Sequence, residues 1–367
     1  MGNSVSWTLA ERVAGWVASG NPRTQQGSPA SLRSVAESLR LEADLSEATV
    51  LAAALVEEAT GLRPLTGPAR SEVLDRPGWV KSNLRTFERL TAPVLDRVAS
   101  RSRFMQGPLG DVAGAATGVE LGVVLGWMSK RVLGQYDLLL AEDDADGDVV
   151  RYVGPNILAI EQRYGFPQRQ FRLWIALHEL THRAQFTAVD WLGPYFLGLV
   201  EEGLVALSPD GRQMLAALRR ALDDARHGGN PVGEMGLMGM LVPPEQRELL
   251  GRIQALMSLL EGHGDVTMDR AGKDAVPEAA WFAECLRERR KSGGAPARLI
   301  QQLLGIDAKM RQYEQGENFV RAVEASGGSE LLGVVWKGAE WLPTMEEIRD
   351  PGLWISRAGS EVARSSR

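Results

Sequence analysis

Apolar residues recur every three to four positions along most of the 367-residue chain, the spacing that places them on one face of an α-helix. Two short stretches, Tyr136–Ala141 and Asp148–Val153, have the content typical of strands and flank a turn at Glu142–Gly147. The sequence therefore predicts a mainly α fold (α+β) with a small antiparallel β-hairpin or sheet. The predicted helical stretches are Trp7–Ser19, Leu32–Thr60 (as two segments), Trp79–Ser100, Gly110–Leu133, Gln168–Gln185, Tyr195–Leu207, Asp210–His227, a segment from Glu245 onward and Glu278–Lys291.

The same patterns divide the chain into three regions. We predict an N-terminal helical region at residues 1–100, a central region at residues 101–335, and a C-terminal tail at residues 336–367. We expect these regions to form one compact domain overall, because 367 residues with 44% hydrophobic content can bury a large core.

Five glycines recur at four-residue intervals in one predicted helix: Gly110, Gly114, Gly118, Gly122 and Gly126. Each costs about 1 kcal/mol relative to alanine in a helix, so the stripe predicts close approach of another backbone. A membrane span needs about 20 mainly apolar residues, whereas Asp111 and Glu120 interrupt this stretch. The pattern therefore favours a tightly packed helix over a membrane-spanning one.

A complete H-E-x-x-H motif, His178-Glu179-Leu180-Thr181-His182, lies inside the strongly apolar predicted helix Gln168–Gln185. Residues four apart lie on one helix face, about one turn apart. The two imidazoles can therefore hold one metal ion, and Glu179 can act on a water at that metal. Zinc suits two histidines and a third side chain, with the fourth position left for water or substrate.

The third ligand is less defined by the sequence. Glu261 is the first candidate, because Asp265 follows it by one helical turn and could orient a ligand histidine from behind. Gly262 and Gly264 weaken a helix there. Glu202, on the next apolar helix after the motif, and His263 are the alternatives.

Composition limits the partners and the compartment. Lys and Arg total 41 against 47 Asp and Glu, giving a formal net charge of −6, so no basic field favours nucleic acid or an anionic membrane. Cys285 is the single cysteine; a disulfide within the chain is therefore impossible, and the composition favours the cytoplasm.

Several segments carry a family resemblance: ALHELTHRAQF, WLGPYFLGLVEEG, MSLLEGHGDVTMD, VLGQYDLLL and YVGPNI. Over roughly Gly110–Asp269 the chain resembles the zincin-like metallopeptidase family of actinobacteria and chloroflexi, whose members are associated with biosynthesis of a deazaflavin coenzyme. The resemblance implies a zincin-like metal helix in a mostly helical protein. It also implies zinc at His178 and His182, Glu179 as base, and a role for the segment Glu261–Asp265.

We therefore predict a zinc-dependent hydrolase, most readily a metallopeptidase acting on a peptide or protein, with Zn²⁺ as cofactor and Glu179 as general base. An alternative is a helical binding scaffold without catalytic activity. In that protein, four side chains such as His178, His182, Glu261 and His263 would close the zinc site, and chelation would unfold the chain.

Overall fold

The computed structural model describes residues 5–19, 35–101, 108–137, 148–206, 244–291 and 306–365. These residues are mainly helical with one small sheet, which confirms the predicted fold class. The predicted helix Asp210–His227 and the turn Glu142–Gly147 lie outside the described residues. Two compact units are present, one from residues 1–188 and 267–292, the other from residues 189–266 and 293–367. The predicted division at residues 100 and 335 stays a prediction.

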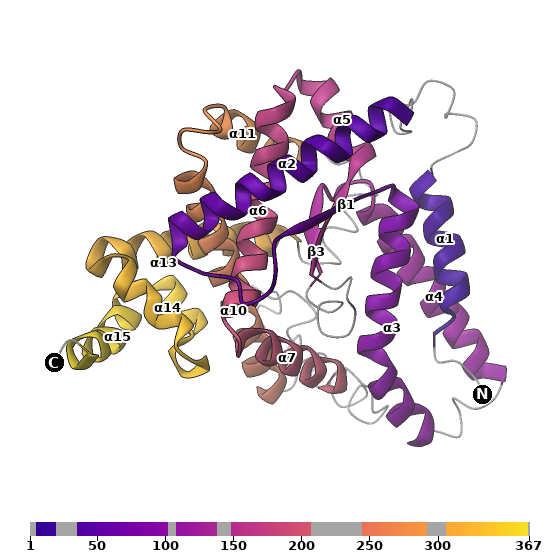
Figure 1. Ribbon diagram of the computed structural model, residues 1–367. Coiled ribbons are helices and arrows are strands. Elements are labelled where there is room, and N and C mark those ends of the chain that lie inside the picture. Colours follow the sequence, from indigo (N-terminus) through magenta and orange to yellow (C-terminus); the bar gives the residue numbers. More distant parts are fainter. Residues whose placement is uncertain are drawn as a thin grey trace. The chain divides into compact units, whose positions relative to one another are not determined.

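The first unit contains helices α1 to α6, the end of α10, α11 and all three strands (Figure 1). Their bounds are α1 Trp7–Ser19, α2 Val35–Thr60, β1 Arg70–Leu74, α3 Arg76–Arg101, α4 Pro108–Met128, β2 Gly134–Tyr136, β3 Val149–Val153, α5 Gly154–Tyr164, α6 Gln168–Ala188 and α11 Ala279–Lys291. Leu32–Thr60, expected as two helical segments, is one continuous helix from Val35 onward.

The sheet has the order β1-β3-β2. β2 pairs antiparallel with β3, and Gly134 lies opposite Tyr152. The predicted strand Tyr136–Ala141 overlaps β2 only at Tyr136, and its residues 138–141 lie outside the described residues. β1 pairs parallel with β3, placing Glu72 beside Arg151. The sheet is therefore mixed rather than wholly antiparallel, and β1 was not predicted, because its partner strand lies almost 80 residues further along the chain.

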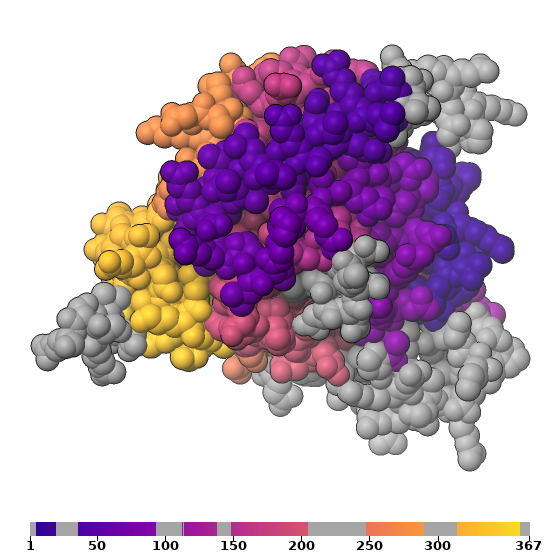
Figure 2. Space-filling model, viewed as in Figure 1, coloured from indigo at the N-terminus to yellow at the C-terminus, as the bar shows by residue number. Residues whose placement is uncertain are grey.

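The two faces of β3 pack against different helices. Val150 and Tyr152 are fully buried in a core with residues of α2 and α6, whereas Val153 packs with residues of α1, α3 and α4. Since side chains alternate across a strand, the single strand β3 joins both cores. The outer residues of α2 (violet) form part of the surface of this unit (Figure 2).

The glycine stripe of α4 packs directly on α1, as its spacing predicted. A Cβ atom at Gly118 would lie 2.6 Å from the carbonyl oxygen of Ser6, and one at Gly122 would lie 2.6 Å from that of Ala10. Only glycine permits such an approach. No helix in the described part of the chain is long and apolar enough to span a membrane.

The second unit is built from helical segments throughout its described length. It contains α7 Leu192–Ala206, most of α10 Pro244–Ala271, α13 Ile306–Leu332, the 3₁₀ turns η3 Gly333–Trp336 and η4 Ala339–Trp341, α14 Met345–Arg349 and α15 Pro351–Ser365. α10 and α13 meet at glycines: a Cβ atom on Gly262 would lie 2.1 Å from the carbonyl carbon of Gly316. Gly262 thus serves helix packing and does not end α10.

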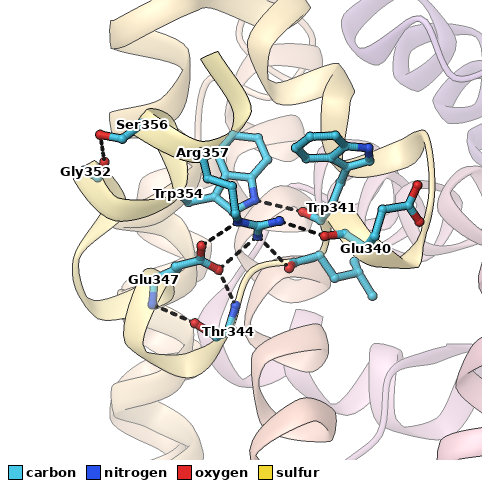
Figure 3. A network of polar contacts seen from close by, with 9 residues as sticks. Glu340, Trp341, Thr344, Glu347, Gly352, Trp354, Ser356 and Arg357 are labelled. Carbon is cyan, nitrogen blue, oxygen red and sulfur yellow. Dashed lines mark hydrogen bonds and ion pairs between the residues drawn. The ribbon is translucent and has the colours of Figure 1, made fainter. Parts of the chain in front are cut away.

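A polar network fixes the C-terminal helices to one another (Figure 3). Thr344 and Glu347 form a reciprocal capping box at the start of α14. The guanidinium of Arg357 on α15 donates to both carboxylate oxygens of Glu347 at 2.8 and 3.0 Å, and to the carbonyl oxygens of Glu340 and Leu342. These bonds satisfy groups that the helix ends would otherwise leave without partners.

Candidate metal centre

The H-E-x-x-H motif lies in the second half of α6, which is buried on most of its circumference. Leu177, Leu180 and Ala184 belong to the core that also contains Val150 and Tyr152 of the sheet. Polar side chains are buried on α6 as well, among them Glu179, Arg183 and Gln185, and buried polar groups need hydrogen-bond partners. The motif is therefore carried by one of the most constrained elements of the first unit.

Two buried arginines hold α6 in place on either side of the motif. Arg172 donates two hydrogen bonds to the carboxylate of Glu161, at 2.8 and 2.9 Å. Burial raises the pKa of Glu161, and the bonds from Arg172 act in the opposite direction. Arg183 donates at 2.8 and 2.5 Å to the two oxygens of Asp148, just before β3, and at 2.7 Å to the carbonyl oxygen of Gly67. These two bidentate arginine–carboxylate pairs fix the rotation of α6 about its own axis, and hence the direction in which its histidines point.

The two histidines face each other. The Nε2 atoms of His178 and His182 lie 3.3 Å apart, and the ring planes are inclined at 87°. Two nitrogens bound to tetrahedral zinc at about 2.0–2.1 Å would be separated by about 3.3–3.4 Å. The separation observed on α6 therefore fits two ligands of one zinc ion.

The other nitrogen of each ring lies beside a group that can accept a hydrogen bond. His182 Nδ1 lies 3.0 Å from Gln185 Oε1, and His178 Nδ1 lies 3.3 Å from the thioether sulfur of Met268. A proton on each Nδ1 would satisfy these contacts and leave the lone pair of each Nε2 for a metal ion.

Glu179 is 7% exposed and points toward strand β2. Its Oε2 accepts a hydrogen bond of 3.1 Å from the backbone N–H of Tyr136, and its side chain packs against Gly134. A backbone donor that is itself part of a sheet fixes the plane of the carboxylate. The carboxylate of the motif is thus buried and held in one orientation by β2 rather than solvated.

Glu261 lies on α10 in the second unit, whereas His178 and His182 lie on α6 in the first. α10 is helical throughout from Pro244 to Ala271, so Glu261 and Asp265 share a helix face, as the sequence predicted.

Glu202 and His263, the two alternatives to Glu261 as third ligand, each contact another side chain. Glu202 on α7 is exposed and lies 3.7 Å from Arg252 in an ion pair. His263 is buried and packs edge to face on Trp336, with 5.1 Å between ring centroids. Both residues lie in the second unit, as Glu261 does, and both stay alternatives to it as the third ligand.

Three contacts of this centre were absent from the sequence-based predictions: Gln185 beside His182, Met268 beside His178, and Gly134 beside Glu179. Gln185 could have been found, because a residue three positions after a ligand lies on the same helix face. Met268 and Gly134 could not, because each meets α6 only through the tertiary fold.

Comparison with known proteins agrees with this geometry. A family model described as "Zincin-like metallopeptidase" matches residues 5–355. A solved structure described as a "putative hydrolase with a novel fold" from Chloroflexus aurantiacus is 30% identical, with a TM-score of 0.66 over 96% of this chain and 98% of that chain. No match is found among curated proteins. Because the family match extends over nearly the whole length, the chain belongs to the zincin-like metallopeptidase family.

Proposed function

We propose that this protein is a zinc-dependent hydrolase that cleaves peptide bonds. The observation that carries the proposal is the pair of Nε2 atoms 3.3 Å apart on α6, on the same helix as the buried, hydrogen-bonded carboxylate of Glu179. Membership in the zincin-like family supports hydrolase chemistry at a general level. An arrangement of two imidazoles and an adjacent carboxylate is the one that metal-assisted hydrolysis requires.

In this proposal His178, His182 and Glu261 hold the zinc. Asp265 is a positioning residue on the same face of α10 as Glu261, one turn further along the helix. Bound zinc would lower the pKa of a water toward about 7 and polarise the scissile carbonyl. Gln185 would keep His182 in the tautomer that presents Nε2, because its side-chain oxygen would accept a hydrogen bond from Nδ1–H.

Glu179 is the proposed general base. Its carboxylate would accept a proton from the attacking water and pass it to the nitrogen of the leaving amine. The backbone N–H of Tyr136 holds the carboxylate in place during both transfers. Because Glu179 is buried in a fixed orientation, little reorganisation would accompany the proton transfer.

The proposed substrate is a peptide or protein in extended conformation. β2 is an edge strand of the sheet, and an edge strand can bind an extended peptide through backbone hydrogen bonds. We further propose, from charge and cysteine content, that the protein acts in the cytoplasm on neither nucleic acid nor membrane. The link to deazaflavin-coenzyme biosynthesis and the actinobacterial and chloroflexal branch stay expectations from the resemblance.

The test is cleavage of a mixed-sequence peptide library by the zinc-loaded protein, followed by mass spectrometry, beside Glu179→Gln. Loss of a general base lowers the rate by about 10²–10⁴-fold, and we expect Glu179→Gln to keep its zinc. A variant that cleaves as fast as the wild type would remove Glu179 from the role of base.

The same samples separate the enzyme from the alternative binding scaffold. An open catalytic centre predicts that chelation abolishes cleavage and leaves most of the helical circular dichroism. A structural centre predicts no cleavage of any library member and unfolding on chelation. That second pair of results would favour the scaffold and overturn the proposal.

A further inference from the structure

A second candidate site lies in the first unit, on the other side of the sheet from α6. A cavity of about 810 Å³ is enclosed by β1, β3 and one face of α3. Arg151 of β3 lines this cavity, whereas its neighbours Val150 and Tyr152 face the core that contains α6. Because side chains alternate across a strand, the cavity lies on one face of β3 and helix α6 packs against the other.

The cavity is strongly cationic. Five positively charged side chains line it, against the two carboxylates of Glu72 and Glu88. The five are Arg70 on β1, Lys81, Arg85 and Arg89 on α3, and Arg151 on β3. The lining therefore carries an excess of three positive charges, whereas the chain as a whole has a formal net charge of −6. A concave site lined by one sign of charge concentrates the opposite ion.

Arg151 gives a second, independent indication that a ligand binds in this cavity. The residue is 9% exposed, and its Nε donates to Glu72 at 3.1 Å. Its Nη1 is buried and has no hydrogen-bond partner. A buried donor on a charged group is unfavourable without a hydrogen-bond partner, and native structures rarely contain one. An anion in the cavity would accept from this nitrogen.

The side chains of α3 that line the cavity are exposed cations rather than packed apolar residues. Lys81, Arg85 and Arg89 are exposed, follow one another at four-residue intervals, and make no ion pair with any described carboxylate. The opposite side of the same turns is anchored, since Asn83 and Gln135 exchange two bonds of 3.2 Å. The cationic side chains are therefore displayed by a fixed helix, at the spacing that puts them on one face.

We propose that this cavity binds a small molecule through a cluster of phosphate groups, such as a triphosphate. Arginine forks match the oxygens of phosphate, and a cavity of this size is typical of small-molecule sites. No aromatic side chain is present among the described lining residues, so the charge cluster, and not a stacked ring, is what the site recognises. The site stands independently of the proposed hydrolysis.

The test is isothermal titration calorimetry of the full-length zinc-loaded protein with tripolyphosphate. Adenosine triphosphate and citrate are titrated in parallel. We expect tripolyphosphate and adenosine triphosphate to bind with similar affinity and citrate to bind more weakly. Binding should weaken steeply with added salt, because the attraction is screened. Much tighter binding of adenosine triphosphate than of tripolyphosphate would overturn recognition by the phosphate cluster alone.

Variants assign the binding to the cavity. The double variant Arg85→Gln with Arg89→Gln should lose roughly tenfold or more in affinity. The matched double variant Arg12→Gln with Lys273→Gln removes two exposed cations of the same unit from outside the cavity, and should bind like the wild type. Glu72→Gln should bind more tightly, because it removes a competing carboxylate from beside Arg151.

Two results would overturn the proposal. One is unchanged affinity in Arg85→Gln with Arg89→Gln. The other is a binding signal that disappears in His178→Ala but survives in the cavity variants, because such a signal reports extraction of zinc by the phosphate compound.

Discussion

A Cβ atom added to Gly134 would lie 2.7 Å from Cγ of Glu179 and 2.8 Å from its Oε1. Strand β2 therefore approaches the motif carboxylate as closely as a residue without a side chain allows. Gly134→Ala should displace Glu179 while leaving the histidines in place. Misplacing a catalytic group by about 1 Å can cost about 10²-fold, so we expect cleavage to fall roughly tenfold to hundredfold with zinc content unchanged.

The control for that change is Gly67→Ala, since a Cβ atom at Gly67 would meet nothing within 4 Å. Initial rates with a peptide identified from the library measure both variants. Equal rates for Gly134→Ala and the wild type would show that the position of Glu179 does not limit hydrolysis.

Gln185→Met tests the support behind His182. The substitution removes the oxygen that lies 3.0 Å from Nδ1 and keeps a buried side chain of similar length. Loss of such a partner typically costs about 10–100-fold in metal affinity. Competition with a zinc-binding dye measures the affinity, and a value equal to that of the wild type would contradict the role assigned to Gln185.

Gly122→Ala and Gly15→Ala form a matched pair on two packed helices. At Gly122 a Cβ atom would lie 2.6 Å from the carbonyl oxygen of Ala10, whereas at Gly15 it would meet nothing within 4 Å. Gly122→Ala should lower the free energy of unfolding by about 1–3 kcal/mol through overpacking. Gly15→Ala should raise it by up to about 1 kcal/mol through helix propensity. Denaturant unfolding measures both, and equal signs would contradict the close contact between α1 and α4.

Arg357→Met gives a prediction for the pH dependence of stability. Burial alone would raise the pKa of Glu347, but hydrogen bonds from Arg357 and Thr344 outweigh it and lower that pKa. A carboxylate with a lowered folded-state pKa stabilises the fold above its unfolded pKa, and this stabilisation is lost as pH falls through the folded value. Arg357→Met should therefore cost about 1–3 kcal/mol near pH 7, and less below about pH 4.

A part of that cost should remain in acid, because Arg357 also donates to the carbonyl oxygens of Glu340 and Leu342. Arg321→Met is the control: its exposed pair with Glu317 is worth about 0.3–0.5 kcal/mol. A destabilisation by Arg357→Met that is the same at pH 7 and at pH 3 would contradict the link to Glu347.

Local patterns in the sequence predicted most helices and named the candidate residues of the proposed metal centre. His178, Glu179 and His182 are fixed by spacing on one helix, and Glu261 could be named because α10 carries it at a regular position. Strand β1 was missed, because its pairing with β3 is long-range and its residues alternate only weakly. The arginine cavity was missed for the same reason, since Arg85 and Arg151 come together only when α3 and β3 are packed.

The role of Gly262 shows another limit of local patterns. Helix propensity argued that glycine there would weaken α10, yet the helix continues to Ala271. The close contact with Gly316 of α13 outweighs the local preference. A residue that is unfavourable for its own helix was required by a partner 54 positions further along the chain.

Zinc content, measured by inductively coupled plasma mass spectrometry on protein purified without added metal, tests the central claim most directly. We predict about one zinc per wild-type chain, its loss in His178→Ala, and its retention in Glu202→Ala, which removes an exposed carboxylate other than the proposed ligand Glu261. Circular dichroism would verify that each variant is folded. Absence of zinc from the wild type even after reconstitution, or full zinc content in a folded His178→Ala variant, would contradict the proposed metal centre.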